Sequence, residues 1–374
     1  MADFEDFAGA RLRIARTFQG RTQADLAAQL GVTQQFVAQL EGGRKQPNAM
    51  LAGVLGDVLG FEPEFFYGAA LTEFTDAECN FRRRRTTPIS VRARALAFGT
   101  LFGQLLQYLQ SQLQLPRQDV PRIHASGPEE IERAAEHCRM HWGLGLEVPI
   151  KNVVRVMERA GVPVTKCPGI GAKVDAFSRA GEPSVLVLTE KPASRCRYDV
   201  AHECGHLVLH NGEPTGTAEA EAEANRFAAA LLLPRAGFAR EFPQSRHGGW
   251  DGLFGLKQRW RVSLAAMIRR AAELSLIGGA EYLRLYKELS ARGWLKHEPH
   301  EFEHEAPEIL PRALDLLHES CGLERQEVAR VLGWRSATFA AITGLEESPV
   351  ESSPDQGQLW HLPALNIPGR RNDA

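Results

Sequence analysis

The segment DVAHECGHLVLH, residues 199–210, carries the side chains with the clearest chemical potential in the chain. His202 and His206 stand four residues apart, so a helix would place them about 40° apart around its axis and one turn along it. Both imidazoles can then reach one metal ion, and Glu203 can accept a proton from the water that attacks a substrate. Apolar neighbours such as Val200 predict a buried helix, where these side chains would be costly without a metal. The pattern predicts a Zn²⁺-dependent hydrolase.

A catalytic zinc site needs a third protein ligand and an open fourth position. A helix is expected over 217–232, in the run AEAEAEANRFAAALLLP. On that helix Glu223 lies within roughly 40° of Phe227, on the stripe expected to face the core. Glu221 falls off this stripe, and Glu219 sits in the first turn, where the helix dipole favours acids in any case. The predicted site therefore consists of Glu203 as general base and of the ligands His202, His206 and Glu223.

Other polar residues near the motif receive weaker interpretations. His210 is rotated further around the helix and is expected to be a polar helix end. A donor that stabilises the developing oxyanion is also needed, and the pattern does not identify it. Three residues are candidates for that role, each with a structural role as the favoured alternative: Arg195, Tyr198 and His247.

The elements that must position these residues are mainly helices with a small β-sheet. With 374 residues, 44% hydrophobic and 24% charged, the chain can form several buried cores. Helices are expected over 128–143, 149–160 and 194–210, with a strand over 162–167 and a strand pair around Gly181. The segments predicted are 1–69, a helical domain; 70–127, an Arg-rich link and a long Gln-rich helix; 128–297, an α+β peptidase domain; 298–345, a helical module; and 346–374, a flexible tail. The Glu-rich run from Lys296 to Glu308 is interpreted as a linker.

Residues 21–47, RTQADLAAQLGVTQQFVAQLEGGRKQP, predict a helix-turn-helix. Thr22 caps a first helix, Gly31 ends it, and Thr33 caps a second helix that would enter a major groove. Glutamine amides on this second helix can pair with adenine edges, whereas Gln23 and Arg44 could hold phosphates. The predicted DNA-contacting residues are Gln23, Thr33, Gln34, Gln35, Gln39 and Arg44.

The overall charge is not that of a generic nucleic-acid-binding protein. The formal net charge is −2, so DNA binding must depend on a local surface. Arg82 to Arg85 adjoin the first domain and are equally well explained as phosphate contacts or as a solvated face. A helical module that only contacts proteins is the alternative for residues 1–69.

Targeting and redox features favour a cytoplasmic protein that does not enter a membrane. The start of the chain lacks the pattern of a signal peptide. The charge-free stretch from Ala95 to Pro116 contains five glutamines, which favours a soluble helix over a membrane span. The 6 cysteines show no C-x-x-C pair, so reduced thiols are expected.

Two family resemblances follow from these motifs. Residues from about Ala8 to Phe66 resemble the Xre/Cro/C1-type helix-turn-helix domains, through T-Q-x-x-L-A-x-x-L-G-V-T and L-E-x-G-x-x-x-P. Residues of about 128–297 resemble the ImmA/IrrE family of bacterial metallopeptidases, through H-E-x-G-H-L-x-L-H and E-A-N-R-F-A-A-x-L-L-x-P. The second resemblance implies a gluzincin-like fold, with His202, His206 and Glu223 as zinc ligands and Glu203 as base. Cys204 departs from the family, and either a small buried hydrophobe or an oxidation-sensitive thiol is expected there.

The resemblances imply a DNA-associated zinc endopeptidase that cleaves a partner repressor, in a stress, DNA-damage or mobile-element response. The alternative is a transcription regulator, or a toxin–antitoxin or phage-defence component, whose peptidase-like domain senses a ligand without turnover. Homodimerisation through the first domain is an analogy only. Residues 307–345 favour a plain helical cap on the peptidase domain over a degenerate helix-turn-helix, because they lack a basic recognition face.

Overall fold

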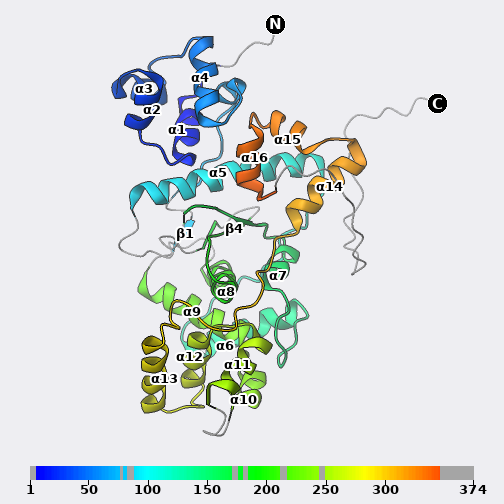
Figure 1. Cartoon of the computed structure of the whole chain (residues 1–374). Helices are drawn as coiled ribbons and strands as arrows, with labels where there is room; N and C mark the ends of the chain where they lie inside the picture. The colour runs from blue at the N-terminus through cyan, green and yellow to red at the C-terminus, as the bar shows by residue number, and fades with distance from the viewer. Residues whose placement is uncertain are drawn as a thin grey trace, which may run out of the picture.

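Helices dominate the chain, as expected, and a small sheet lies near its middle (Figure 1). The structure is a computed structural model that describes residues 6–75, 79–81, 88–170, 176–179, 184–210, 217–243 and 249–345. The predicted tail 346–374, His247 and the run Arg82 to Arg85 lie outside these residues. None of the described helices combines the length and the apolar character that a membrane span requires.

The amino-terminal domain forms one end of the molecule in Figure 1. Its elements are α1 (Gly9–Phe18), α2 (Gln23–Leu30), α3 (Gln34–Glu41), α4 (Ala49–Leu59) and the 3-10 helix η1 (Pro63–Tyr67). The long α5 (Ile89–Gln112) runs beneath this domain and contacts α1. The predicted Gln-rich helix therefore exists, and buried residues such as Phe98, Phe102 and Leu105 lie on its packed face.

The central region holds most of the remaining helices. They are α6 (Pro128–His141), α7 (Val153–Arg159), α8 (Ala193–Leu209), α9 (Ala218–Leu232), α10 (Arg235–Glu241), α11 (Gly249–Trp260), α12 (Leu264–Glu273) and α13 (Gly279–Ala291). The three helices at the carboxyl-terminal side are α14 (Ile309–Cys321), α15 (Arg325–Val331) and α16 (Ser336–Thr343). The expected helices over 128–143, 194–210 and 217–232 are confirmed within a few residues.

The sheet separates two hydrophobic cores. Its strands β1 (Cys79–Phe81), β2 (Val164–Lys166), β3 (Phe177–Arg179) and β4 (Val185–Leu188) lie in the order β1-β3-β4-β2. The β2–β4 pair is parallel and the other two pairs are antiparallel. Successive side chains of a strand point to opposite faces. Val185 and Val187 therefore enter the core shared with α5, whereas Leu186 and Leu188 enter the core around α8.

The carboxyl-terminal module packs mainly against the amino-terminal side of the molecule. The Glu62 amide donates to the Gly333 carbonyl over 2.9 Å, and the Trp334 indole donates to the Gln104 side chain over 3.2 Å. The hydroxyl of Thr165 on β2 also donates to the Ile342 carbonyl. The module is therefore not a cap on the peptidase region alone, because α14–α16 share the core of α1–α5 and also touch the sheet.

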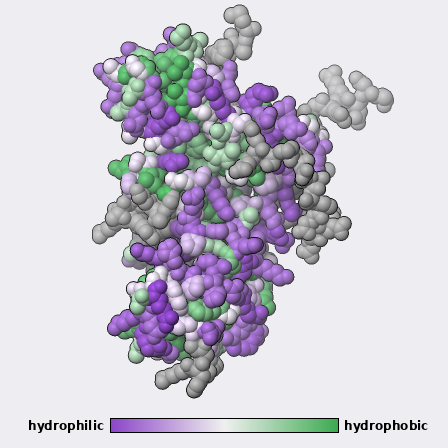
Figure 2. Space-filling model, in the orientation of Figure 1, coloured by the Kyte–Doolittle hydropathy of each residue, from purple (hydrophilic) through white to green (hydrophobic). Residues whose placement is uncertain are grey.

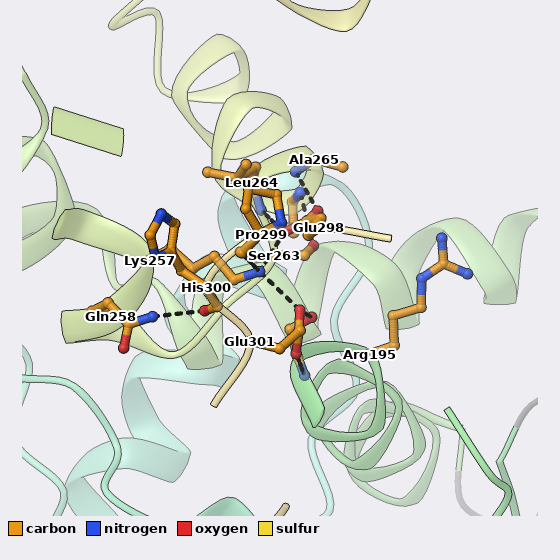
Figure 3. Close-up of polar contacts among 12 residues, drawn as sticks. Arg195, Lys257, Gln258, Ser263, Leu264, Ala265, Glu298, Pro299, His300 and Glu301 are labelled. Atoms are coloured by element: carbon orange, nitrogen blue, oxygen red, sulfur yellow. Dashed lines mark hydrogen bonds and ion pairs between the residues drawn. The ribbon is translucent and has the colours of Figure 1, made fainter. Parts of the chain in front are cut away.

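The acidic run of residues 298–308, called here the acidic strap, is not a free linker. Lys257 is fully buried, and its ammonium group donates to Glu298 over 2.9 Å and to Glu301 over 2.8 Å (Figure 3). Glu298 also accepts from the Leu264 amide, and Glu301 accepts from the Ser194 amide. These amides open α12 and α8, where the partial positive charge of a helix start favours a carboxylate.

Further along the acidic strap, toward α14, glutamates again accept hydrogen bonds from amides at helix starts. Glu305 accepts from the amides of Val153 and Val154 at the start of α7, at 2.7 and 3.1 Å. Conversely, Glu158 of α7 accepts from the Glu308 and Ile309 amides at the start of α14, at 2.9 and 3.1 Å. Glutamates of the strap thus bind the starts of α12, α8 and α7, and the Glu158 side chain binds the start of α14, where the strap ends.

Candidate metal centre

Helix α8 carries the predicted motif at the centre of the second core. It contacts β3, β4, α7 and α9, and nearly every residue from Ala193 to Leu209 is buried. His202, Glu203 and His206 are each 1% exposed. The periodicity argument for a buried motif helix is therefore confirmed.

Helix α9 lies against α8 at Gly205. A Cβ atom at this glycine would stand 3.2 Å from both the Cα and the carbonyl oxygen of Ala224. The hydroxyl of Tyr198 on α8 also donates to the Asn225 carbonyl over 2.9 Å, and the Thr217 hydroxyl caps α9 by accepting from the Ala220 amide. Because Gly205 has no side chain, α9 can approach α8 closely at this residue, with Ala224 opposite it.

This crossing places Glu221 beside the two histidines. Its carboxylate oxygens lie 3.4 Å from the Nε2 atoms of His202 and His206, and the two Nε2 atoms lie 3.1 Å apart. Tetrahedral zinc with bonds of about 2.0–2.1 Å needs ligand atoms roughly 3.3–3.4 Å apart. Among the described residues, these three side chains form a group whose potential ligand atoms all lie within 4.8 Å of one another. This spacing fits binding of one metal ion.

The predicted third ligand, Glu223, is not in this group; Glu221 is the carboxylate that lies beside the two histidines. Around α9, Glu221 stands about 60° from Ala224 and Glu223 about 100° from it, in the opposite direction. The apolar stripe through Phe227 does not show which glutamate faces the histidines, because both α8 and α6 pack against α9. The register fixed by Gly205 and Ala224 decides which glutamate meets the imidazoles.

Glu223 instead contacts His210, at the end of α8. Its carboxylate lies 2.8 Å from His210 Nε2, and His210 Nδ1 lies 3.1 Å from His206 Nδ1. His210 is only 7% exposed. It is therefore part of the polar network behind the site, which the interpretation as a helix end did not anticipate.

Glu203, the predicted general base, follows His202 directly in the motif helix α8. The Ser178 hydroxyl on β3 donates to its carboxylate over 2.7 Å, and both side chains are buried. Nothing in the sequence pattern had singled out Ser178. At Glu221 burial alone would raise the pKa, but the hydrogen bonds and positive charge of His202 and His206 outweigh it and hold the pKa below its ordinary value.

The remaining predicted residues near the site have structural partners. Arg195 donates to the Leu295 carbonyl, and Tyr198 binds α9 as described. Burial raises the pKa of the Cys204 thiol well above its ordinary value, so this side chain behaves as a small buried hydrophobe.

The predicted helix-turn-helix is formed by α2 and α3. Gly31 ends α2 with a φ of 65°, and the Thr33 hydroxyl caps α3 by accepting from the Phe36 amide. Gln34 and Gln35 are exposed on the first turn of α3, Gln39 is half-buried, and Arg44 is exposed after the helix. The Gln23 amide, expected on a phosphate, donates to Glu41 over 2.7 Å within the domain.

Comparisons with known proteins identify two domains in the chain. Residues 157–272 match the family model described as the IrrE N-terminal-like domain of peptidase M78, and residues 8–64 match a helix-turn-helix domain. No curated protein matches the chain. One solved structure, a Mycobacterium tuberculosis transcriptional regulator, is 17% identical with a TM-score of 0.29, over 47% of this chain and 52% of that chain. The chain thus spans about half the length of that protein. The family match and the His202–His206–Glu221 group together indicate a metal-binding peptidase-type domain.

Proposed function

We propose that this chain is a zinc-dependent endopeptidase that its amino-terminal domain brings to DNA. The observation that carries the proposal is the meeting of His202, His206 and Glu221 around one point. Glu203 follows His202 on the same buried helix. A buried scaffold has no physical need for two imidazoles and two carboxylates in this arrangement. Two histidines and one glutamate are also a known ligand set of catalytic zinc.

The residues of the chain divide the work of peptide hydrolysis. His202, His206 and Glu221 would hold Zn²⁺, which supplies Lewis-acid polarisation of the scissile carbonyl and of the attacking water. Glu203 accepts a proton from that water and passes it to the leaving amine. The Ser178 hydroxyl holds the Glu203 carboxylate in one orientation by donating to it.

The amino-terminal domain supports a substrate found on or near DNA. The exposed Gln34 and Gln35 on α3 suit readout of base edges. We propose a partner transcriptional repressor as substrate, cleaved in the cytoplasm in a stress, DNA-damage or mobile-element response. Figure 2 shows an apolar patch on this domain, and α4 exposes Met50 by 80% and Val54 by 39%. Such a patch suits contact with another protein or with a second copy of the chain.

A second candidate function is a transcription regulator whose peptidase-like domain senses a ligand without turnover. The observation in its favour is the 1% exposure of His202, Glu203 and His206. Such burial leaves little surface of these three groups for a peptide to contact, although the Glu221 side chain is 21% exposed. The two functions differ in whether a metal-loaded protein hydrolyses a peptide bond.

The test compares the wild type with Glu203→Gln and His202→Ala. Elemental analysis should give about one zinc per chain in the wild type and in Glu203→Gln, but little in His202→Ala. Incubation of zinc-loaded protein with helix-turn-helix repressors of the same cell, followed by mass spectrometry, should yield fragments with the wild type and none with Glu203→Gln. Glu219→Gln, an exposed acid on α9, is the control that keeps both properties. A wild type without bound metal after zinc addition would overturn the proposal, whereas metal without cleavage of any repressor would favour the sensor.

A further inference from the structure

The two imidazoles that face the metal position differ in what lies behind them. Behind His206, its Nδ1 atom lies 3.1 Å from His210 Nδ1, and His210 Nε2 lies 2.8 Å from the Glu223 carboxylate. Behind His202, the buried Nδ1 atom has no hydrogen-bond partner among the described residues. Only one of the two predicted ligands is therefore backed by a chain of polar groups in the described structure.

The chain of groups has a single consistent arrangement of protons when His206 binds a metal. A metal on Nε2 requires the proton of the neutral ring to be on Nδ1. His206 Nδ1 then donates to His210 Nδ1, which must be an unprotonated acceptor. The remaining proton of His210 is therefore on Nε2, from which it donates to the Glu223 carboxylate. Each ring makes one donation, and the series ends at an acceptor that needs no proton.

The helices hold these residues in positions that favour this arrangement of protons. His202, His206 and His210 recur every four residues along α8, so His210 lies one turn beyond His206. Glu223 reaches His210 from α9, the same helix that supplies Glu221. His206 is 1% and His210 7% exposed, so water competes little for their ring nitrogens. Without Glu223, His210 could place its proton on Nδ1, and His206 would then carry its own proton on the Nε2 atom that must bind the metal.

We propose that His210 and Glu223 are positioning residues that hold His206 in its metal-binding tautomer and orientation, and thereby raise the metal affinity of the site. This inference rests on the proposed function, because it presupposes that His206 is a ligand. It assigns to Glu223 a role behind the ligand. Carboxylate–histidine partners of this kind typically change metal affinity 10- to 100-fold.

The test measures zinc affinity by competition with a chromophoric chelator in the full-length protein. Glu223→Gln should bind one zinc per chain with an affinity about 10–100-fold weaker than the wild type. Glu219→Gln removes an exposed carboxylate one turn earlier on α9 and should leave the affinity unchanged. The visible spectrum of the cobalt-substituted protein should stay that of a four-coordinate site in Glu223→Gln and be lost in Glu221→Gln.

The outcomes separate this inference from the zinc site itself. Equal affinities of Glu223→Gln and Glu219→Gln would overturn the positioning role and leave the zinc site standing. Loss of the cobalt spectrum in Glu223→Gln, with retention in Glu221→Gln, would make Glu223 a ligand and also overturn it. A wild type that binds no metal would remove the proposed function and this inference with it. If Glu223→Gln does not fold, His210→Phe removes both ring nitrogens and should give the same loss of affinity.

Discussion

Replacing Gly205 by alanine tests whether the crossing of α8 and α9 builds the metal centre. The added Cβ would stand 3.2 Å from three atoms of α9, two of them backbone atoms of Ala224 and one on the Phe227 ring. Backbone atoms cannot rotate away, so α9 must shift by a few tenths of an ångström. Glu221 lies on the same helix, one turn before Ala224, and must shift with it.

A matched alanine substitution isolates the steric contribution. Gly255 lies inside α11, is exposed, and has no atom within 4 Å of its added Cβ. Both substitutions gain about 1 kcal/mol of helix propensity. Only Gly205→Ala also incurs the overpacking cost of roughly 1–3 kcal/mol. The free energy of unfolding of the two variants should therefore differ by about 1–3 kcal/mol, with Gly205→Ala the less stable.

Circular dichroism during heating measures this difference. Each 1 kcal/mol corresponds to roughly 2–4 °C in Tm for a domain of this size. Zinc affinity should also fall in Gly205→Ala and stay at the wild-type value in Gly255→Ala, because only the first substitution displaces Glu221. A Gly205→Ala variant as stable as Gly255→Ala, with unchanged zinc affinity, would refute the idea that this contact positions the ligand.

Three further predictions concern other parts of the molecule. Lys257→Met should lower the free energy of unfolding by about 3–5 kcal/mol, because it leaves Glu298 and Glu301 without their buried cation; urea unfolding checks this, with the exposed Lys287→Met as control. Burial raises the pKa of Glu158 to about 8, so the folded state holds a proton that the unfolded state releases above its ordinary pKa near 4.5. Stability should therefore fall as pH rises from about 5 to 8, by up to about 1.4 kcal/mol per pH unit, and Glu158→Gln should abolish the fall in urea titrations. Gln35→Ala should weaken binding to a selected operator by about 1–3 kcal/mol in fluorescence anisotropy at fixed salt, without lowering Tm; unchanged affinity would contradict the assigned recognition face.

Elements with local signals could be predicted from the sequence. The helix-turn-helix can be predicted from its capping residues, because Thr22, Gly31 and Thr33 each act on residues within one turn. The helices α8 and α9 show their apolar periodicity within a short window, and the H-E-x-x-H spacing places two ligands without knowledge of any other element. These parts of the fold and of the site required no long-range information.

The third ligand could not be obtained in the same way, because it depends on the register between two helices. The periodicity of α9 shows that the helix is buried, but two helices bury it, on different sides. A better signal was present in the small residues Ala220, Ala224 and Ala228, which recur every four residues and are all buried. Small residues at this spacing permit close approach to the Gly205 side of α8, and Glu221 borders that face. The choice between Glu221 and Glu223 thus needs the docked pair of helices.

The acidic strap shows the same limit in the electrostatics. A Glu-rich run with prolines indicates a solvated linker only when its charges have no partners. Here Glu298, Glu301 and Glu305 accept from helix amides or pair with buried cations that lie far away in sequence, such as Lys257 and Arg197. The distribution of charge along the chain cannot show this, because each cation lies in a different, apolar-looking helix. The strap joins the peptidase-type region to α14, and α14 belongs to the core of the amino-terminal domain. Its carboxylates bind the strap to α11 and to the motif helix α8, so loss of Lys257 should loosen this connecting segment as well as lower stability.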